Sequence, residues 1–182
     1  HDAWQSGSAG FRMDSRLSGQ DRLTLQGDYF SGSFDENYTF YQLPTAADPR
    51  YSWSQDSRAR ADGGNLLARW QRTLSATDNL SLQLYYDHYQ RTMTVLGETR
   101  DTVDLDFQHR FALGSRQELI WGLGYRYSHD KLAQTPYISF SKPELGVSLF
   151  SAFIQDEIRL VPDTLSLILG SRFEHNDFTS FE

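Results

Sequence analysis

The chain has 182 residues, of which 38% are hydrophobic and 14% aromatic, and 24 Asp and Glu against 17 Lys and Arg give a formal net charge of −7. This acidic balance argues against a nucleic-acid partner, because phosphate binding needs clustered Lys and Arg. The absence of cysteine excludes disulfide bonds and thiolate metal sites, and no stretch approaches the roughly 18 apolar residues of a membrane-spanning helix.

Eight β-strands are expected, paired in chain order as four hairpins. Apolar residues recur at every second position, as in Leu80, Leu82, Leu84 and Tyr86, and this period indicates strands with one apolar face. Gly, Asp, Asn, Ser and Pro form a short turn within each hairpin. The predicted strands are residues 7–17 and 23–33, 66–74 and 80–92, 102–113 and 118–128, and 147–161 and 165–175.

The connections between hairpins are longer and uneven. The longest is expected to be a loop over residues 34–64, with a second loop over 130–146 and a short connection near 96–99. Tight turns at one end of the strands and long loops at the other are typical of outer-membrane barrels. No linker or low-complexity run divides the sequence, so residues 1–182 are expected to form a single domain.

The apolar face of each strand ends in an aromatic residue, as at Tyr29, Tyr86, Tyr127 and Phe173, which suits a membrane interface. The other face is polar and charged. About 10 residues rising about 3.4 Å each, tilted near 45°, span about 24 Å, close to the apolar band of such barrels. The predicted fold is therefore all-β, an antiparallel up-and-down meander of about eight strands from a transmembrane β-barrel.

Two other interpretations stay open. Eight strands can close into a complete small outer-membrane barrel with a structural or adhesion role, whose narrow lumen is filled by side chains. A soluble β-sandwich acting as a binding module would show the same alternation with its apolar face turned inward.

The hairpins resemble those that recur in TonB-dependent outer-membrane receptors. The most specific runs from Phe-Ile-Gln-Asp-Glu-Ile-Arg-Leu at 153–160, through a Pro-Asp turn, into Leu-Ser-Leu-Ile-Leu-Gly-Ser-Arg-Phe-Glu-His at 165–175. Residues 67–70 leading to 80–86, and residues 104–110 followed by 121–126, are similar to two further hairpins of the family. The resemblance runs through nearly the whole chain.

This resemblance implies a 22-stranded barrel in the bacterial outer membrane, closed by a plug domain and energised by the TonB complex of the inner membrane. It implies import of a scarce nutrient, by default a ferric siderophore, with cobalamin, haem or a sugar as other candidates. Lacking a plug, a TonB box and enough strands, the chain is expected to be a middle section of such a receptor. Its start at His1 without an initiator Met, and its end at 179–182 without a terminal aromatic strand, agree with a fragment. The unpaired edges of a fragment invite pairing with a second copy.

No enzyme activity, catalytic group, metal site or cofactor is predicted, because the five His residues are scattered and none occurs in a metal-binding motif. Each His is expected in an ordinary interface or lumen role. Asp104 and Asp106 share a face, and nearby arginines such as Arg110 or Arg126 are expected to balance their charge. Gly122 and Gly124 share the polar face and indicate either clearance for a plug or local barrel curvature.

Substrate binding is expected where aromatic and Arg side chains gather at the loop end of the polar face. Such side chains hold an anionic, aromatic iron chelate by stacking and charge. The alternative for each residue is an ordinary solvated loop or girdle position. The predicted substrate-binding residues are Tyr41, Trp53, Tyr89, Arg91, Arg126 and Arg172.

Overall fold

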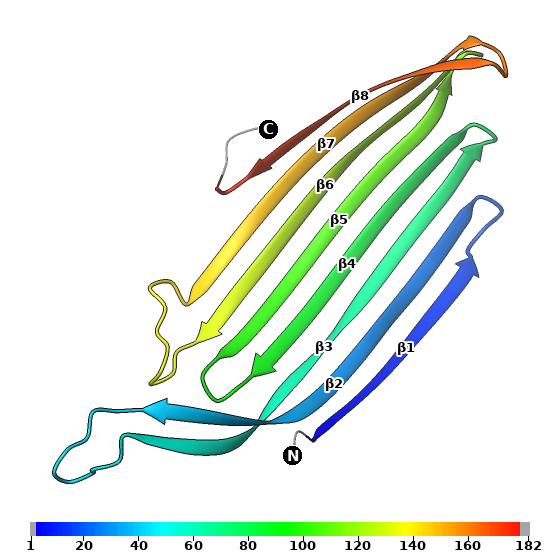
Figure 1. Cartoon of the computed structure of the whole chain (residues 1–182). Helices are drawn as coiled ribbons and strands as arrows, with labels where there is room; N and C mark the ends of the chain where they lie inside the picture. Colours follow the sequence, from blue (N-terminus) through cyan, green and yellow to red (C-terminus); the bar gives the residue numbers. More distant parts are fainter. Residues whose placement is uncertain (1–2, 179–182) are drawn as a thin grey trace.

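The structure, a computed structural model, describes residues 3–178, and these form one eight-stranded sheet without helices. Neighbouring strands pair antiparallel in chain order, so the predicted up-and-down meander is confirmed (Figure 1). The strands are β1 (Trp4–Arg16), β2 (Asp21–Tyr41), β3 (Ser52–Ser75), β4 (Asp78–Thr92), β5 (Gly97–Leu113), β6 (Gln117–Ala133), β7 (Glu144–Val161) and β8 (Leu165–Asn176).

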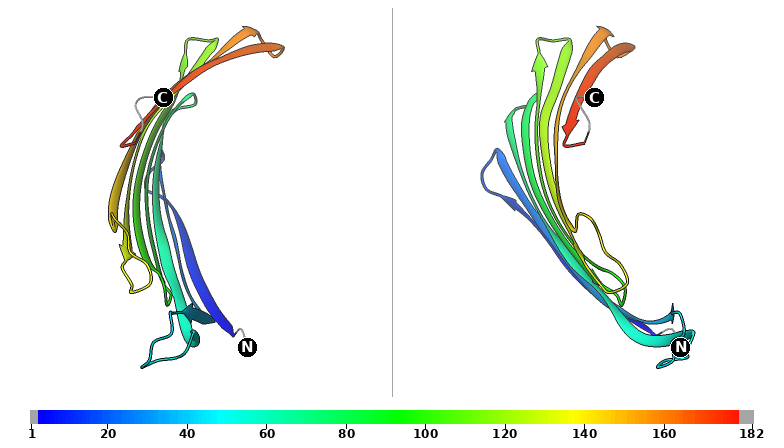
Figure 2. Two further views of the ribbon diagram at one scale, coloured as in Figure 1. Left: turned by 60° about the vertical axis from the view of Figure 1, so that its left-hand side comes forward. Right: turned by 90° about the vertical axis from the view of Figure 1, so that its left-hand side faces the viewer.

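The sheet is curved and open (Figure 2). β1 pairs with β2 and β8 pairs with β7, and within residues 3–178 each of these outer strands has no second partner. The segment therefore has the form of a barrel wall with two free edges, and it does not close on itself. The expected ending at residues 179–182 lies outside the described residues.

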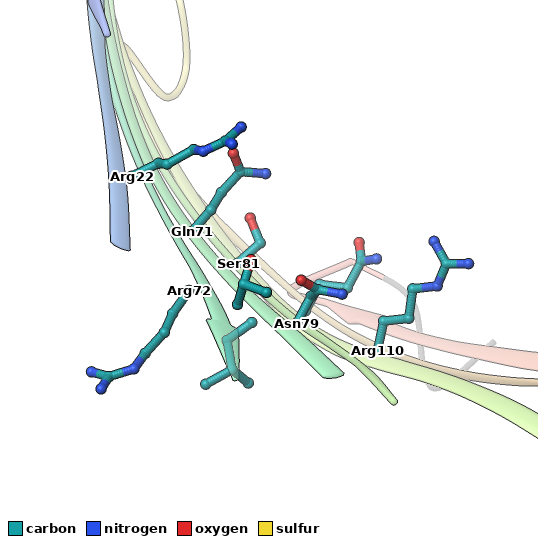
Figure 3. Close-up of a pocket in the computed structure, with 9 residues that line it drawn as sticks. Arg22, Gln71, Arg72, Asn79, Ser81 and Arg110 are labelled. Carbon is teal, nitrogen blue, oxygen red and sulfur yellow. The ribbon is translucent and has the colours of Figure 1, made fainter. Parts of the chain in front are cut away.

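The polar residues of neighbouring strands meet on the concave face. Arg22 lies opposite Gln71, which lies opposite Ser81, and all three point to the concave side, whereas Arg72 points away from it (Figure 3). Because side chains alternate along a strand, the leucines between these polar positions face the convex side.

The convex face has no cover in residues 3–178. Leu84 is 47% exposed and Leu105 is 42% exposed, and among the described residues Ala59 is the only apolar side chain that is buried. A soluble sandwich would bury this face under a second sheet. A continuous exposed apolar face over so many strands fits contact with lipid.

The four predicted tight turns are confirmed, and two of them need unusual backbone angles. Gly114 has φ 71°, which glycine adopts without steric cost, and Asp163 has φ 57° in the Pro-Asp turn between β7 and β8. Asp is one of the few other residues that tolerates this region, so the local sequence determines where both hairpins turn.

The predicted long loop at 34–64 is wrong. β2 continues to Tyr41 and β3 begins at Ser52, which leaves only residues 42–51 as loop. The predicted loop at 130–146 likewise shrinks to 134–143, because β6 continues to Ala133 and β7 begins at Glu144. A membrane span needs only 9–11 residues, so the outer parts of these strands project beyond the lipid with water on both faces. No apolar alternation is required there, and the period-2 signal fades.

Candidate substrate-binding surface at the loop end

Four aromatic rings gather at the outer end of the sheet. Phe40 of β2 lies at the centre, with its ring centroid 4.2 Å from Tyr137, 5.3 Å from Trp53 and 6.1 Å from Tyr38. Tyr38 and Trp53 belong to the β2–β3 hairpin, whereas Tyr137 comes from the β6–β7 loop. The outer aromatic cluster (Tyr38, Phe40, Trp53 and Tyr137) thus joins two segments that are distant in sequence.

Hydrogen bonds tie the short β4–β5 connection to the same hairpin. Glu36 Oε1 of β2 accepts hydrogen bonds from the Thr94 backbone N–H at 2.8 Å, the Thr94 hydroxyl at 2.9 Å and the Ser57 hydroxyl at 3.0 Å. The Thr135 hydroxyl of the β6–β7 loop donates to the Val95 carbonyl at 3.1 Å. Three connections at the outer end therefore hold one another in place.

Charge in this region centres on Glu36. Burial raises the pKa of the Glu36 carboxyl, but the hydrogen bonds from Thr94 and Ser57 outweigh burial and leave the pKa below its ordinary value. Burial and the negative charge of Glu36 raise the pKa of the Tyr38 phenol, although Arg91 opposes them. The Arg91 guanidinium lies 3.5 Å from Glu98, so one arginine and the two carboxylates Glu36 and Glu98 lie on the Tyr38 side of the cluster.

The surface combines flat rings with cationic and hydrogen-bonding groups, and it stands on projecting strands above a lipid-facing wall. The family model described as TonB dependent receptor-like, beta-barrel matches residues 3–181. The chain belongs to this family. As a TonB-dependent receptor barrel it lies in the bacterial outer membrane. A comparison with curated proteins gives no match.

Solved receptors of Pseudomonas aeruginosa share the fold. The G324V mutant of the ferric enterobactin receptor PfeA has a TM-score of 0.67 at 13% identity, over 98% of this chain and 30% of that one. The FpvA receptor bound to heterologous pyoverdines has a TM-score of 0.58 at 12% identity, over 96% of this chain and 31% of that one. The siderophore receptor PirA has a TM-score of 0.51 at 14% identity, over 97% and 36%. The chain thus spans about a third of the length of the receptors it matches.

In this receptor barrel, the predicted site residues divide between two faces. Trp53 belongs to the outer aromatic cluster. Tyr41 does not, because it is adjacent to Phe40 on β2 and therefore points to the opposite face. Its ring centroid lies 5.8 Å from that of Tyr51, and the residue is 70% exposed. Tyr41 therefore does not converge with Trp53.

The other four predicted residues lie on the concave face at different depths. Tyr89 and Arg91 are close to the outer end, and the Tyr89 ring lies 6.4 Å from Phe30. Arg126 donates to Asp104 at 2.6 Å, and Asp104 is the one buried charged residue of the sheet described here. Arg172 donates to Glu174 at 2.7 Å on the edge strand β8. Of the six predicted residues, only Trp53 belongs to the outer aromatic cluster, and Arg91 lies near enough to act on the Tyr38 phenol.

Arg126 forms a salt bridge with Asp104, and Arg110 pairs instead with Glu118. Among residues 3–178, Asp106 has no arginine within salt-bridge distance, so the expected balance is seen for Asp104 and not for Asp106. Two histidines have a carboxylate partner on the neighbouring strand: His88 Nδ1 lies 2.8 Å from Asp101, and His109 Nε2 lies 2.9 Å from Asp78. Within residues 3–178 no group of three or more His, Asp or Glu residues is placed to hold a metal ion.

The two glycines of β6 leave room for neighbouring side chains of the sheet itself. A Cβ at Gly122 would meet Phe153 Cε1 at 2.5 Å and the Phe107 carbonyl at 2.6 Å. At Gly124 it would meet the Ser151 hydroxyl at 2.6 Å. The Phe153 ring from β7 thus covers the backbone of Gly122. An aromatic side chain on a neighbouring strand stabilises a glycine in a sheet in this way.

Three residues of the site escaped the sequence analysis as binding candidates: Phe40, Tyr137 and Glu36. Phe40 and Tyr38 are two positions apart on β2, so they face the same side. This alternation was overlooked because residues 34–64 were expected to form a loop. Tyr137 follows Pro136 in a loop, where the sequence shows no alternation of apolar and polar residues. Its contact with β2 is long-range, so no local pattern marks it.

Proposed function

We propose that this chain is part of a TonB-dependent receptor that imports a ferric siderophore across the outer membrane. In the whole receptor a plug domain closes the lumen, and the TonB complex of the inner membrane supplies the energy for uptake. No catalytic activity is expected. Family membership supports the receptor class, and the similarity to the ferric enterobactin receptor PfeA, the siderophore receptor PirA and the pyoverdine-bound FpvA favours an iron chelate.

The outer aromatic cluster carries the substrate proposal. Siderophore complexes present flat or acidic groups, and rings beside an arginine bind such groups by stacking and charge. Phe40, Trp53 and Tyr137 provide the rings, and Arg91, which pairs with Glu98 and acts electrostatically on the Tyr38 phenol, provides the guanidinium. Because two separate connections contribute these rings, a ligand seated there would contact the receptor on two sides.

The test is a titration of the full-length receptor in detergent with ferric enterobactin and with ferripyoverdine. Quenching of the intrinsic tryptophan fluorescence measures binding. The proposal expects saturable binding of at least one chelate, and a lower affinity for the receptor with Trp53→Ala and Arg91→Ala. Ala replacement of both Arg91 and Arg126 with unchanged affinity would contradict the arginine role. Haem, cobalamin and an oligosaccharide serve as competing probes, and preference for one of them would replace the siderophore.

A further inference from the structure

Arg72 of β3 lies on the lipid side of the barrel wall, near the tight turn between β3 and β4. Its side chain points away from the concave face, which holds Arg22 and Gln71 (Figure 3). On the convex face Arg72 follows Trp70 toward the turn, and its cross-strand partner on β4 is Leu80. Because tight turns mark the periplasmic rim of an outer-membrane barrel, Arg72 lies at the periplasmic boundary of the lipid.

The Arg72 guanidinium has unused hydrogen-bonding capacity. Among the described residues its Nε is buried without a hydrogen-bond partner, and its Nη1 approaches only Asp21, at 3.8 Å, too far for a hydrogen bond. Asp21 is itself engaged, because it accepts from the Ser18 hydroxyl at 2.6 Å and from the Trp70 indole N–H at 3.1 Å. The Arg72 side chain is 42% exposed, so its outer N–H groups are open to a ligand on the lipid side.

A second carboxylate lies on the same face near Arg72. Asp78 is two positions from Leu80 on β4, so it also faces the lipid side. His109 Nε2 lies 2.9 Å from Asp78 Oδ1, and the Trp121 indole N–H donates to His109 Nδ1 at 3.3 Å. Because an imidazole nitrogen that accepts a hydrogen bond carries no proton, His109 is uncharged in this arrangement and does not neutralise the negative charge of Asp78.

We call Trp70, Arg72, Asp78 and Trp121 the periplasmic girdle site. It combines a cation and an anion with two indole rings, which favour the headgroup level of a bilayer. Leu82, the cross-strand partner of Trp70, is 37% exposed and continues the lipid-facing surface toward the membrane centre. Two opposite charges at the edge of an apolar wall match a ligand that carries both charges on one headgroup and lays its acyl chains along the leucines.

We propose that the periplasmic girdle site binds the zwitterionic headgroup of a phospholipid, with the phosphate on Arg72 and a primary ammonium on Asp78. Guanidinium N–H groups bind phosphate oxygens, and ammonium N–H groups donate to a carboxylate. The inference needs the outer-membrane barrel and is independent of the imported substrate.

The charges of the site distinguish between headgroups. A purely anionic headgroup brings its negative charge beside both Asp21 and Asp78, and like charges in contact are unfavourable. A quaternary ammonium has no N–H group to donate to Asp78. The site therefore selects phosphoethanolamine over phosphoglycerol and phosphocholine headgroups.

The test is a lipid titration of the full-length receptor in detergent, with native mass spectrometry to count the bound lipids. Phosphatidylethanolamine, phosphatidylglycerol and phosphatidylcholine with identical acyl chains serve as the probes. Arg72→Gln removes the cation, whereas Arg72→Lys keeps it. Asp78→Asn removes the negative charge and retains an oxygen that can accept the bond from His109 Nε2. The matched control is Arg22→Gln, because Arg22 lies at the same end of the sheet on the concave face (Figure 3).

The unaltered receptor is expected to bind phosphatidylethanolamine more tightly than the other two lipids. Arg72→Gln should weaken the binding of all three lipids about tenfold, because all three carry the phosphate, and Arg72→Lys should retain most of the affinity. Asp78→Asn should weaken only phosphatidylethanolamine, to the level of phosphatidylcholine, and Arg22→Gln should change nothing.

Heat-modified gel mobility checks that each barrel is folded. Equal affinities for the three lipids, or a preference for phosphatidylglycerol, would overturn the inference. Unchanged lipid binding by a folded Arg72→Gln receptor, or an equal loss in Arg22→Gln, would overturn it as well.

Discussion

Phe40 of β2 and Tyr137 of the β6–β7 loop stack with their ring centroids 4.2 Å apart and their planes 19° apart. This single contact bridges the sheet from its second strand to the connection after its sixth. Together with the bond from Thr135 to Val95, it draws the β6–β7 loop over the concave side, where a ligand entering from outside would arrive.

Replacing Tyr137 with Ala removes one face of this stack. An aromatic pair contributes about 0.5–1.5 kcal/mol, so the affinity for the bound chelate is expected to fall by up to about tenfold. Fluorescence titration of the full-length receptor measures the change. Tyr41→Ala is the matched control, because Tyr41 lies on the other face of the same hairpin and should leave the affinity unchanged. Equal losses for both variants would show that the cluster has no special role.

Glu36→Gln is expected to loosen the β4–β5 connection in a pH-dependent way. The pKa of Glu36 is lowered from 4.5, so its carboxylate stabilises the fold above that value and the contribution is lost as pH falls through the folded pKa. Near neutral pH the variant should lose about 1 kcal/mol of protection at the Thr94 amide, measured by hydrogen exchange. Below the folded pKa the two proteins should converge, and a constant difference at all pH values would argue against a role of the charge.

Arg126→Ala leaves the Asp104 carboxylate without its cation. Asp104 is only 8% exposed, whereas the Arg126 side chain is 56% exposed, so a moderate loss of about 1–2 kcal/mol in barrel stability is expected. Adding Asp104→Asn should recover part of that loss, because a neutral amide costs less to bury unpaired. Unfolding by urea in detergent micelles measures all three proteins. A double variant less stable than Arg126→Ala would contradict this ion pair as the cause.

Gly122→Ala is expected to destabilise the barrel by about 1–3 kcal/mol, since its methyl group would overlap both Phe153 and the Phe107 carbonyl. Gly7→Ala is the control, because a Cβ at Gly7 meets nothing within 4 Å. The same urea experiment compares them. Tolerance of both substitutions would mean that the Phe153 ring does not cover the Gly122 backbone.

The membrane-spanning parts of the strands could be predicted from sequence because their two faces meet different environments, lipid on one side and the barrel interior on the other. Leu82 and Leu84 must meet lipid while Gln83 faces the interior, and this contrast imposes the period of two. Beyond the lipid the contrast ends, so residues 34–41 of β2 look like loop although they pair with β3 over their whole length. Backbone hydrogen bonding, which no side-chain pattern reports, holds them there.

The site was harder to predict than the fold for a related reason. Tyr41 and Trp53 appear in the same stretch of sequence, and only the register of β2 against β3 shows that they face opposite sides. Trp53 pairs with Phe40, which has the correct parity, and the β6–β7 loop then adds Tyr137. Register and loop path are long-range properties, so residue type alone cannot supply them.

The orientation of the leucine face underlies both the membrane location and the two proposed binding surfaces. A cysteine scan of residues 81–87 on β4 in the full-length receptor tests this orientation. Because the segment contains no cysteine, each introduced cysteine is the only one within it that a fluorophore can label. A fluorophore at each position is measured in vesicles with and without brominated lipid chains. Strong quenching at 82, 84 and 86 and weak quenching at 81, 83, 85 and 87 is the predicted result. Quenching at the odd positions instead, or at none, would contradict a lipid-facing convex wall.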